Sequence, residues 1–248
     1  MKAAIVGYGK MGKEIEEILS ERKHQVISRI DPTDKNATHG SITAESLKDV
    51  DVVFEFSKPE AAVKNIELIA SHKKNIVIGT TGWANDLKKV EKIVAKNKIA
   101  LVYGNNFSIG VNMFYRIVER AAELVNKLPE YDIYGYEVHH NQKADSPSGT
   151  AKSLAEIIVS NITRKKKAVF DRVEGKISGS DMHFASVRGG GVPGTHVVAM
   201  DGTADSIELR HTARSRAGFA LGAVMAGEWL KGKKGMFTVS DYMNQLLR

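Results

Sequence analysis

Hydrophobic and polar positions alternate between strand-like and helix-like spacing over the first hundred residues. Strands are predicted over five apolar runs, at residues 1–6, 25–30, 51–56, 75–78 and 99–103. Helices are predicted between them, over residues 13–21, 60–71 and 85–97, where apolar positions recur at helical spacing. Strands that alternate with helices in this way are typical of an α/β fold with a Rossmann-like, doubly wound parallel sheet.

The pattern changes after about residue 107. A long helix is predicted over residues 108–127, and strand patterns then dominate, with one further helix over 151–160. These strands, separated by glycine-rich turns, lie at residues 132–138, 182–187, 195–200 and 206–211. Residues 217–231 return to a helical pattern. We therefore expect a second, smaller α+β domain with a mixed or antiparallel sheet.

A glycine motif, Gly7-x-Gly9-x-x-Gly12, follows the first predicted strand and opens the first predicted helix. In that setting Gly7 permits a tight turn, Gly9 lets the backbone approach a pyrophosphate, and Gly12 allows close packing of helix and strand. The helix N-terminus offers free N–H groups to the phosphates. Asp31 ends the second predicted strand, where a carboxylate binds the adenine ribose. The motif predicts a dinucleotide site; the alternative is a glycine turn with an unrelated surface Asp.

The charges near Asp31 bear on the choice of cofactor. A carboxylate there would repel the 2′-phosphate of NADPH, which favours NADH. Arg29, Lys10 and Lys35 could offset this repulsion, although each is more simply a surface charge. The sequence therefore predicts good use of NADH and leaves NADPH open.

Two further loops follow predicted strands of the first domain. Gly79-Thr80-Thr81-Gly82 is small enough to let a nicotinamide ribose and ring approach the backbone, and an ordinary turn explains it equally well. Residues 106–112 join the two expected domains, where we expect a hinge or a nicotinamide contact. Capping of the following helix by Ser108 is the simpler alternative for that segment.

Composition narrows the class of protein. The chain has no cysteine, which excludes disulfides, thiolate catalysis and Cys-ligated metals. Its net charge of +7 favours small anionic ligands. The densest basic run, residues 164–167, has no interleaved aromatics, so we expect a solvated loop or helix end and no nucleic-acid binding. Neither a secretory signal nor a membrane-spanning run is evident, and a cytoplasmic protein is expected.

The run from Glu137 to Ala151 holds the candidate chemistry. His139 and His140 are adjacent at a predicted strand end and point in different directions, so they are not expected to bind one metal together. One histidine can act as a general acid near neutral pH, and Lys143 can bind a carboxylate. Ser148-Gly149-Thr150 opens the next helix and would form an anion cradle. Beside a cofactor site, this run predicts an oxidoreductase for an anionic substrate; structural histidines are the alternative.

The chain resembles the 4-hydroxy-tetrahydrodipicolinate reductases, also called dihydrodipicolinate reductases, of the diaminopimelate and lysine pathway. The run from Glu137 to Ala151 matches the family signature, with Ser146 in place of the usual Ala. The glycine loop at Gly7 and five further segments also match, namely residues 56–57, 79–82, 106–112, 188–190 and 211–219. Thr195 stands where many members have Glu.

The resemblance implies roles for individual residues. His139 matches the general acid and Lys143 its partner in substrate binding and proton transfer. Contacts to the substrate are implied at His140, Ser148, Gly149, Thr150 and Arg216. Contacts to the cofactor are implied at Gly7, Tyr8, Gly9, Lys10, Met11, Gly12, Asp31, Phe56, Ser57, Gly79, Thr80, Thr81, Gly104, Asn105, Asn106 and Phe107.

The resemblance also implies the reaction and the assembly. Hydride passes from NADH or NADPH to C4 of a cyclic α,β-unsaturated imine with two carboxylates, and protonation and loss of water give tetrahydrodipicolinate. Residues 1–106 and 216–248 form the dinucleotide-binding domain, and residues 107–215 bind substrate and hold a homotetramer together through their sheet. No metal is expected.

Two other functions stay open on the residues alone. A different Rossmann dehydrogenase, acting on an amino-acid semialdehyde or on aspartate, would share the glycine motif but has no need for Pro147-Ser148-Gly149-Thr150 after the histidines. A nucleotide-sensing regulator would keep the glycines and could dispense with His139 and Lys143. The presence of both residues argues against a sensor.

Overall fold

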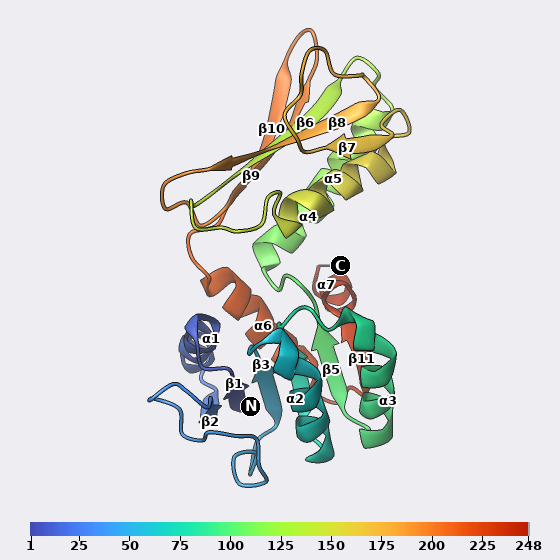
Figure 1. Cartoon of the computed structure of the whole chain (residues 1–248). Coiled ribbons are helices and arrows are strands. Elements are labelled where there is room, and N and C mark those ends of the chain that lie inside the picture. The colour runs from blue at the N-terminus through green and yellow to red at the C-terminus, as the bar shows by residue number, and fades with distance from the viewer. Residues whose placement is uncertain (248) are drawn as a thin grey trace. The chain divides into compact units, whose positions relative to one another are not determined.

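The computed structural model describes residues 1–247, which form two compact units (Figure 1). The first unit contains residues 1–109 together with the C-terminal segment from Arg216 on, and the second contains Gly110–Ser215. The chain therefore leaves the first unit once, through helix α4 (Ile109–Asn126), and returns to it at the start of helix α6 (Ala217–Trp229).

The first unit is built on a six-stranded, all-parallel sheet with the order β11-β5-β4-β3-β1-β2. Its strands are β1 (Lys2–Val6), β2 (Gln25–Ile30), β3 (Val52–Glu55), β4 (Asn75–Ile78), β5 (Ala100–Tyr103) and β11 (Gly235–Thr238). Its helices are α1 (Lys10–Glu21), α2 (Pro59–Ser71), the short 3-10 helix η1 (Ala84–Asp86), α3 (Leu87–Asn97), α6 and α7 (Val239–Leu246). The predicted Rossmann-like parallel sheet is confirmed.

Both faces of this sheet are buried, because successive side chains of a strand point to opposite faces. Ile5 and Phe54 pack on the face covered by α1, α6 and α7. Val53 and Ile76 pack on the other face, which α2 and α3 cover (Figure 1). Strands that are buried on both sides have continuous apolar sequences. The sequence therefore predicts these strands from apolar runs, although apolar and polar residues do not alternate in them.

Strand β11 is one that the hydrophobic pattern does not predict. The structure pairs Gly235–Thr238 in parallel with β5, beyond the last helix predicted at residues 217–231. Helix α7 begins directly afterwards with a capping box, in which Thr238 accepts a hydrogen bond from the Asp241 amide and the Asp241 side chain accepts from the Thr238 amide. A strand of four half-buried residues is too short to show a period of its own.

The second unit contains a five-stranded mixed sheet with the order β10-β9-β6-β8-β7. Its elements after α4 are β6 (Asp132–His139), α5 (Gly149–Asn161), β7 (Lys167–Val169), β8 (Asp181–Arg188), β9 (Thr195–Asp201) and β10 (Ser206–Thr212). Strand β9 is antiparallel to β6 and β10, while β8 is parallel to β6 and β7. The expected mixed sheet is confirmed, with β7 as an additional short strand.

Helices α4 and α5 cover one face of this sheet. Phe114 and Val118 of α4 and Leu154 of α5 pack with Phe184 of β8 in one apolar cluster. The other face is open within the unit, since Tyr134 is 46% exposed and Val187 is 49% exposed. Helix α4 has 18 residues, and no helix within residues 1–247 is long and apolar enough to cross a membrane.

The expectation of a solvated loop or helix end at residues 164–167 holds for part of this run, which follows the end of α5: Lys166 and Lys167 are exposed, whereas Arg164 and Lys165 are engaged within the second unit. The Lys165 side chain is only 1% exposed; it donates to two backbone carbonyls and forms an ion pair with Asp132. Arg164 donates to the carbonyls of Val125 and Tyr131, and Lys167 begins strand β7. Two of these four charges therefore hold loops of the second unit together. The local sequence does not predict which distant residues a basic side chain contacts in the folded protein.

Candidate functional site

The loops that follow the carboxyl ends of the parallel strands meet at one edge of the first unit. Strand β1 lies between β2 and β3, and its following turn contacts the loop after β3. Gly7 has φ +88°, and a Cβ there would lie 2.3 Å from the Phe56 carbonyl oxygen. A Cβ on Gly12 would lie 2.4 Å from the Gly7 carbonyl oxygen. Both positions require glycine for the turn itself, at the switch point where doubly wound sheets bind nucleotides.

Gly9 differs from its two neighbours in the motif. It is the N-cap of α1, and a Cβ built on it would meet no atom within 4 Å. The fold therefore does not need glycine at this position. An open backbone at the N-terminus of a twelve-residue helix fits the close approach of a pyrophosphate, so these residues suit a dinucleotide.

Asp31 lies beside this turn, where the sequence places it. Its Oδ2 accepts a hydrogen bond from the Tyr8 amide at 2.9 Å, and its Oδ1 accepts from the amides of Thr33 and Asp34. Burial raises the pKa of Asp31, but the hydrogen bonds from Thr33, Tyr8 and Asp34 outweigh it and leave the pKa below its usual value. Asp31 is therefore an anion held rigidly beside the glycine turn.

Two basic side chains near Asp31, Arg29 and Lys13, are engaged by carboxylates. Arg29 binds Glu16 through Nε at 2.8 Å and through Nη2, and this contact raises the pKa of Arg29 further. Lys13 forms an ion pair of 2.8 Å with Asp34. Lys10 lies exposed in the first turn of α1. The role of Glu16 was not predicted, because a Glu on an amphipathic helix looks like any solvated charge.

The loops after β3, β4 and β5 place the other predicted cofactor residues along the same edge. The Thr80 hydroxyl accepts a hydrogen bond from the Ser57 amide at 2.9 Å, and the Phe56 ring packs on Gly79, where a Cβ would lie 2.1 Å from it. Phe56 and Phe107 lie with ring centroids 6.2 Å apart. Thr81 and Asn105 are exposed, Asn106 is half-buried, and Gly104 packs against α7.

Glu55 is a buried acid at this edge that the sequence analysis did not single out. Its Oε1 accepts from Asn65 Nδ2 at 2.9 Å and from the Ser57 hydroxyl. Burial raises the pKa of Glu55. It stabilises the loop that carries Phe56 and Ser57.

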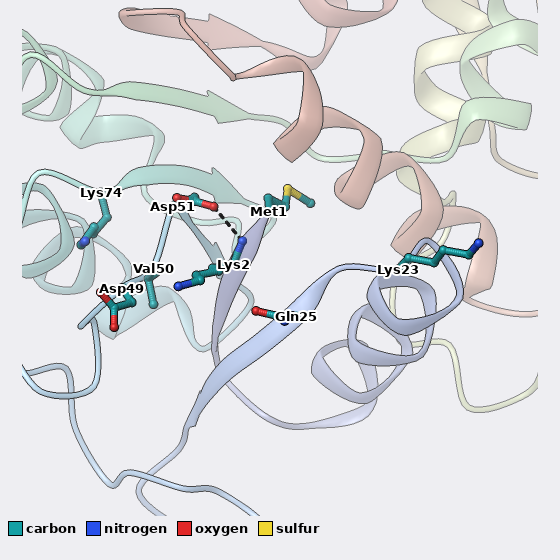
Figure 2. A pocket seen from close by; sticks show the side chains of 8 residues that line it. All are labelled: Met1, Lys2, Lys23, Gln25, Asp49, Val50, Asp51 and Lys74. Atoms are coloured by element: carbon teal, nitrogen blue, oxygen red, sulfur yellow. Dashed lines mark hydrogen bonds between the residues drawn. The ribbon is translucent and has the colours of Figure 1, made fainter.

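A pocket of about 550 Å³ lies at the opposite edge of the same sheet (Figure 2). Its lining residues are Met1, Lys2, Lys23, Gln25, Asp49, Val50, Asp51 and Lys74. They precede or begin strands β1 to β4, at their amino ends. Doubly wound sheets bind ligands at the carboxyl ends of their strands, so this pocket is not the candidate site.

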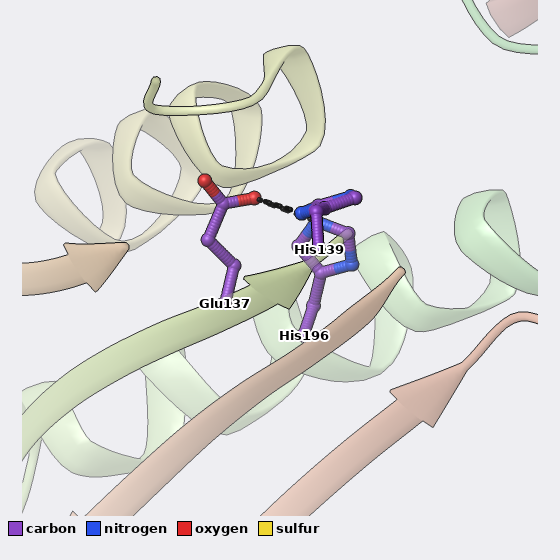
Figure 3. Close-up of side chains that lie close together, drawn as sticks. All are labelled: Glu137, His139 and His196. Atoms are coloured by element: carbon purple, nitrogen blue, oxygen red, sulfur yellow. Dashed lines mark ion pairs between the residues drawn. The ribbon is translucent and has the colours of Figure 1, made fainter. Parts of the chain in front are cut away.

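The second unit gathers buried polar groups beside the N-terminus of α5. Register brings them together, because Glu137 of β6 lies opposite His196 of β9 and Ser186 of β8. His139 is two residues further along β6 and therefore faces the same side as Glu137. Figure 3 shows the Glu137, His139 and His196 side chains converging. Glu137 Oε2 lies 2.9 Å from His139 Nδ1 and 3.5 Å from His196 Nε2.

Burial and charge set the protonation states in this cluster. The pKa of His139 is lowered to about 4, first by burial and also by His196, Lys143 and Arg188, against the opposing attraction of Glu137. Burial alone would raise the pKa of Glu137, but contacts with His196, Ser148 and Arg188 hold it well below its usual range. At neutral pH the cluster therefore holds a carboxylate anion against a neutral His139.

The remaining predicted residues of the second unit surround this cluster. Lys143 Nζ lies 2.6 Å from Asp145 Oδ1 and is partly exposed, and His140 is half-buried. Ser148 is buried; its hydroxyl caps α5 by accepting from the Ala151 amide at 3.1 Å and contacts His196 Nε2 at 3.1 Å. The Ser148 hydroxyl is thus committed within the protein.

Gly149 and Thr150 form the first turn of α5. Gly149 is exposed, and a Cβ on it would meet nothing within 4 Å. Thr150 is half-buried. A carboxylate can therefore reach the N-terminus of this thirteen-residue helix. Arg216 caps α6 in the first unit, and its place at the substrate rests on the resemblance alone.

The same cluster meets the distance requirement for a metal site. One ligand atom each from Glu137, His139 and His196 lies within 4.8 Å of the others. Arg188 Nη2 also lies 2.9 Å from Glu137 Oε1, and Lys143 adds positive charge near His139. These cations oppose a metal ion, and they favour use of the cluster for an anionic ligand and a proton.

Models of one protein family match nearly the whole chain. The model described as dihydrodipicolinate reductase, N-terminus, matches residues 1–107, and the model for the C-terminus matches residues 110–243. A 4-hydroxy-tetrahydrodipicolinate reductase of Christiangramia forsetii is 40% identical over 250 residues, with 100% of both chains covered. One from Methanococcus aeolicus is 33% identical over 272 residues, with 98% of each chain covered.

Solved structures share the fold at lower identity. A dipicolinate-bound dihydrodipicolinate reductase from a Paenisporosarcina species has a TM-score of 0.77 at 23% identity, with 96% of this chain and 97% of that chain covered. A DAP dehydrogenase of C. glutamicum in complex with DAP has a TM-score of 0.54 at 15% identity, with 96% and 92% covered. These two structures share the overall fold of this chain.

Proposed function

The chain belongs to the dihydrodipicolinate reductase family, and on that basis we propose that it reduces 4-hydroxy-tetrahydrodipicolinate to tetrahydrodipicolinate in the diaminopimelate route to lysine. It is an oxidoreductase of amino-acid biosynthesis. One observation in the structure supports this proposal above others: a buried Glu137–His139 pair beside the open N-terminus of α5. That arrangement can bind a carboxylate and move a proton at one place.

The residues divide the work of the reaction. A bound reduced nicotinamide supplies the hydride. The turn at Gly7–Gly12 and the N-terminus of α1 hold the cofactor phosphates, and Asp31 holds the adenine ribose. Lys143 and the first turn of α5 bind the two carboxylates of the substrate. A dihydrodipicolinate reductase of known structure binds dipicolinate, which also carries two carboxylates. His139 delivers the proton.

His139 is neutral before a ligand binds, because its pKa is about 4. A dianionic ligand beside the ring adds negative charge, which raises the pKa of the imidazole. Binding is then accompanied by proton uptake, and the ring becomes the acid that the reaction requires. The low pKa is thus compatible with acid catalysis once the ligand charge is included.

Within this proposal, NADH is the preferred cofactor. Asp31 is an anion beside the adenine ribose site, so it repels a 2′-phosphate. Arg29 and Lys13, two cations that could compensate, are held by Glu16 and Asp34. NADPH is expected to be used less efficiently.

The same proposal includes a cytoplasmic homotetramer built on the open sheet face of the second unit. Tyr134 and Val187 expose large apolar side chains on that face, and such patches commonly mark protein interfaces. A cysteine-free chain is compatible with a reducing compartment. Light scattering on the purified protein, and on a Val187→Glu variant that should dissociate, tests the assembly.

Turnover tests the function directly. Substrate is generated from pyruvate and aspartate semialdehyde by the preceding synthase, and the loss of NADH or NADPH absorbance is followed. We expect oxidation that depends on the synthase and is faster with NADH. Folded protein that binds NADH but shows no turnover with either cofactor would contradict the proposal and favour another dehydrogenase substrate or a sensor.

A further inference from the structure

Glu137 is a charged group in a place where charge is costly. Its side chain is 0% exposed, on the helix-covered face of the second unit's sheet. A buried carboxylate destabilises a fold unless hydrogen bonds and charges compensate it. Its two oxygens have different partners, and the difference indicates what the residue does.

Oxygen Oε1 is fully engaged within the protein. It accepts hydrogen bonds from the Ser148 amide at 2.9 Å, the Ser186 hydroxyl at 2.8 Å and Arg188 Nη2 at 2.9 Å. Ser148 is the N-cap of α5, so this oxygen ties the carboxylate-binding turn of α5 to strand β6. Oε1 therefore sets where the helix begins relative to His139.

Oxygen Oε2 faces the two histidines and makes no aligned hydrogen bond. It lies 2.9 Å from His139 Nδ1, yet both atoms are buried without a hydrogen-bond partner of good geometry. The other nitrogen of the ring points toward Gly194, where a Cβ would lie 2.9 Å from His139 Nε2. A proton on Nδ1 would face Glu137 and leave Nε2 for exchange with a ligand.

We propose that Glu137 is a positioning residue that holds the His139 ring with Nδ1 toward its carboxylate, stabilises the protonated ring when a dicarboxylate binds, and fixes the start of α5 at the same time. This inference rests on the proposed function, since it assigns Glu137 to the acid and the carboxylate cradle of that reaction. A carboxylate that orients and stabilises a catalytic imidazole acts in the same way in other enzymes.

The other titratable groups around His139 cannot take this role. They are Lys143 after β6, Arg188 on β8 and His196 on β9, with His211 of β10 behind His196. Lys143, Arg188 and His196 each disfavour a positive charge on His139. Among residues 1–247, the influences that set the pKa of His139 include one carboxylate, Glu137. The protonated ring therefore depends on Glu137.

Glu137→Gln removes the charge with little change of shape. We expect kcat at neutral pH to fall about ten- to hundredfold and the alkaline limb of the kcat profile, where the acid loses its proton, to move to lower pH, because the ring holds its proton less well. Glu156→Gln is the matched control, since it makes the same change at an exposed acid of α5 outside the cluster; kcat within about twofold of the parent is expected. Equal kcat and equal pH profiles for Glu137→Gln and the parent would overturn the proposal.

A second measurement uses the unaltered protein, in case Glu137→Gln does not fold. Nitrogen-15 NMR of the histidine rings is expected to show His139 protonated on Nδ1 alone, and protonated on both nitrogens after addition of dipicolinate near pH 7. Protonation on Nε2 alone, or no proton uptake with dipicolinate, would contradict the proposal. Unaltered protein without reductase turnover would instead refute the proposed function, so the two failures are distinguishable.

Discussion

The two candidate regions are built by opposite means. The cofactor edge of the first unit consists of loops from one sheet, and its geometry depends on the absence of side chains at Gly7 and Gly12. The chemical cluster of the second unit consists of side chains on strands β6, β8 and β9 and the start of α5, and its geometry depends on one buried charge. The first region is made by backbone, and the second by side chains.

The difference has a functional consequence. Backbone N–H groups bind phosphates by shape and partial charge, with no change of protonation. A cluster of Glu137 and His139 responds to the charge of a bound ligand, because burial has already displaced both pKa values. Substitutions at Glu137 or His139 should therefore leave the affinity for the cofactor unchanged. Substitutions in the glycine turn should likewise leave the rate of the chemical step unchanged.

The largest effect is expected from His139→Gln. General acid catalysis by a positioned histidine contributes about 10²–10⁴-fold, so kcat should fall by that factor. The NADH dissociation constant should be unchanged, because His139 belongs to the second unit. The coupled assay and a fluorescence titration with NADH measure the two quantities. A normal kcat would remove His139 from the chemistry.

Gly9→Ala should have the next largest effect, and it should act on the cofactor alone. The fold has room for the added methyl, since nothing lies within 4 Å of it, but the methyl blocks the approach of a pyrophosphate. We expect NADH affinity to fall about tenfold or more, which corresponds to about 1.4 kcal/mol, at unchanged stability.

The matched control for Gly9→Ala is Gly12→Ala, whose Cβ would lie 2.4 Å from the Gly7 carbonyl oxygen and should destabilise the protein. If Gly9→Ala bound NADH as tightly as the parent, the assignment of this turn to the pyrophosphate would fail.

Glu16→Ala should change cofactor preference by a smaller amount. The substitution releases Arg29, which would then be available to a 2′-phosphate near Asp31. NADPH efficiency should rise about two- to fivefold relative to NADH, a typical size for one exposed charge contact. Glu17→Ala, an exposed acid on the same helix, is the control and should leave the ratio of the two efficiencies unchanged. A ratio that also stays constant in Glu16→Ala would show that Arg29 does not reach the ribose site.

The last expected effect is on stability in mild acid and not on turnover or binding. His139 has a pKa of about 4 in the folded protein and about 6.5 in an unfolded chain, so the unfolded chain binds more protons between these values. Stability should therefore fall as pH decreases from about 6.5 to about 4, by about 1–3 kcal/mol from this group. Urea unfolding at several pH values measures the slope, and His139→Gln should reduce it. A slope that is the same in both proteins would contradict the low pKa.

The sequence predicts the first region better than the second, for physical reasons. Glycine turns, strand runs and the distance from Gly12 to Asp31 are local, so one stretch of chain contains most of the signal. Glu137, Arg188 and His196 meet only through the register of three strands, and no local pattern sets a register. The sequence predicts a functional site in the run after Glu137, but the role of Glu137 itself can be inferred only from the structure.

The same reasoning explains the smaller differences. The hydroxyl of Ser148 caps α5 and contacts His196, two partners that the sequence did not indicate, and its contact with the substrate stays a prediction. Lys165 was expected in solvent, and it is buried among carbonyls contributed by a loop and strand more than ten residues away. In each case a polar residue was assigned from its type, while its partner was decided by tertiary packing.

The central claim is that the glycine turn of the first unit binds the cofactor and that the cluster of the second unit performs the chemistry. Its most direct test is the NADH dissociation constant of His139→Gln and of Gly9→Ala, measured by fluorescence titration in one series with the unaltered protein. The account predicts that His139→Gln binds NADH within about twofold of the parent while Gly9→Ala binds about tenfold or more weakly. Weak binding by His139→Gln, together with normal binding by Gly9→Ala, would contradict it and place the cofactor elsewhere.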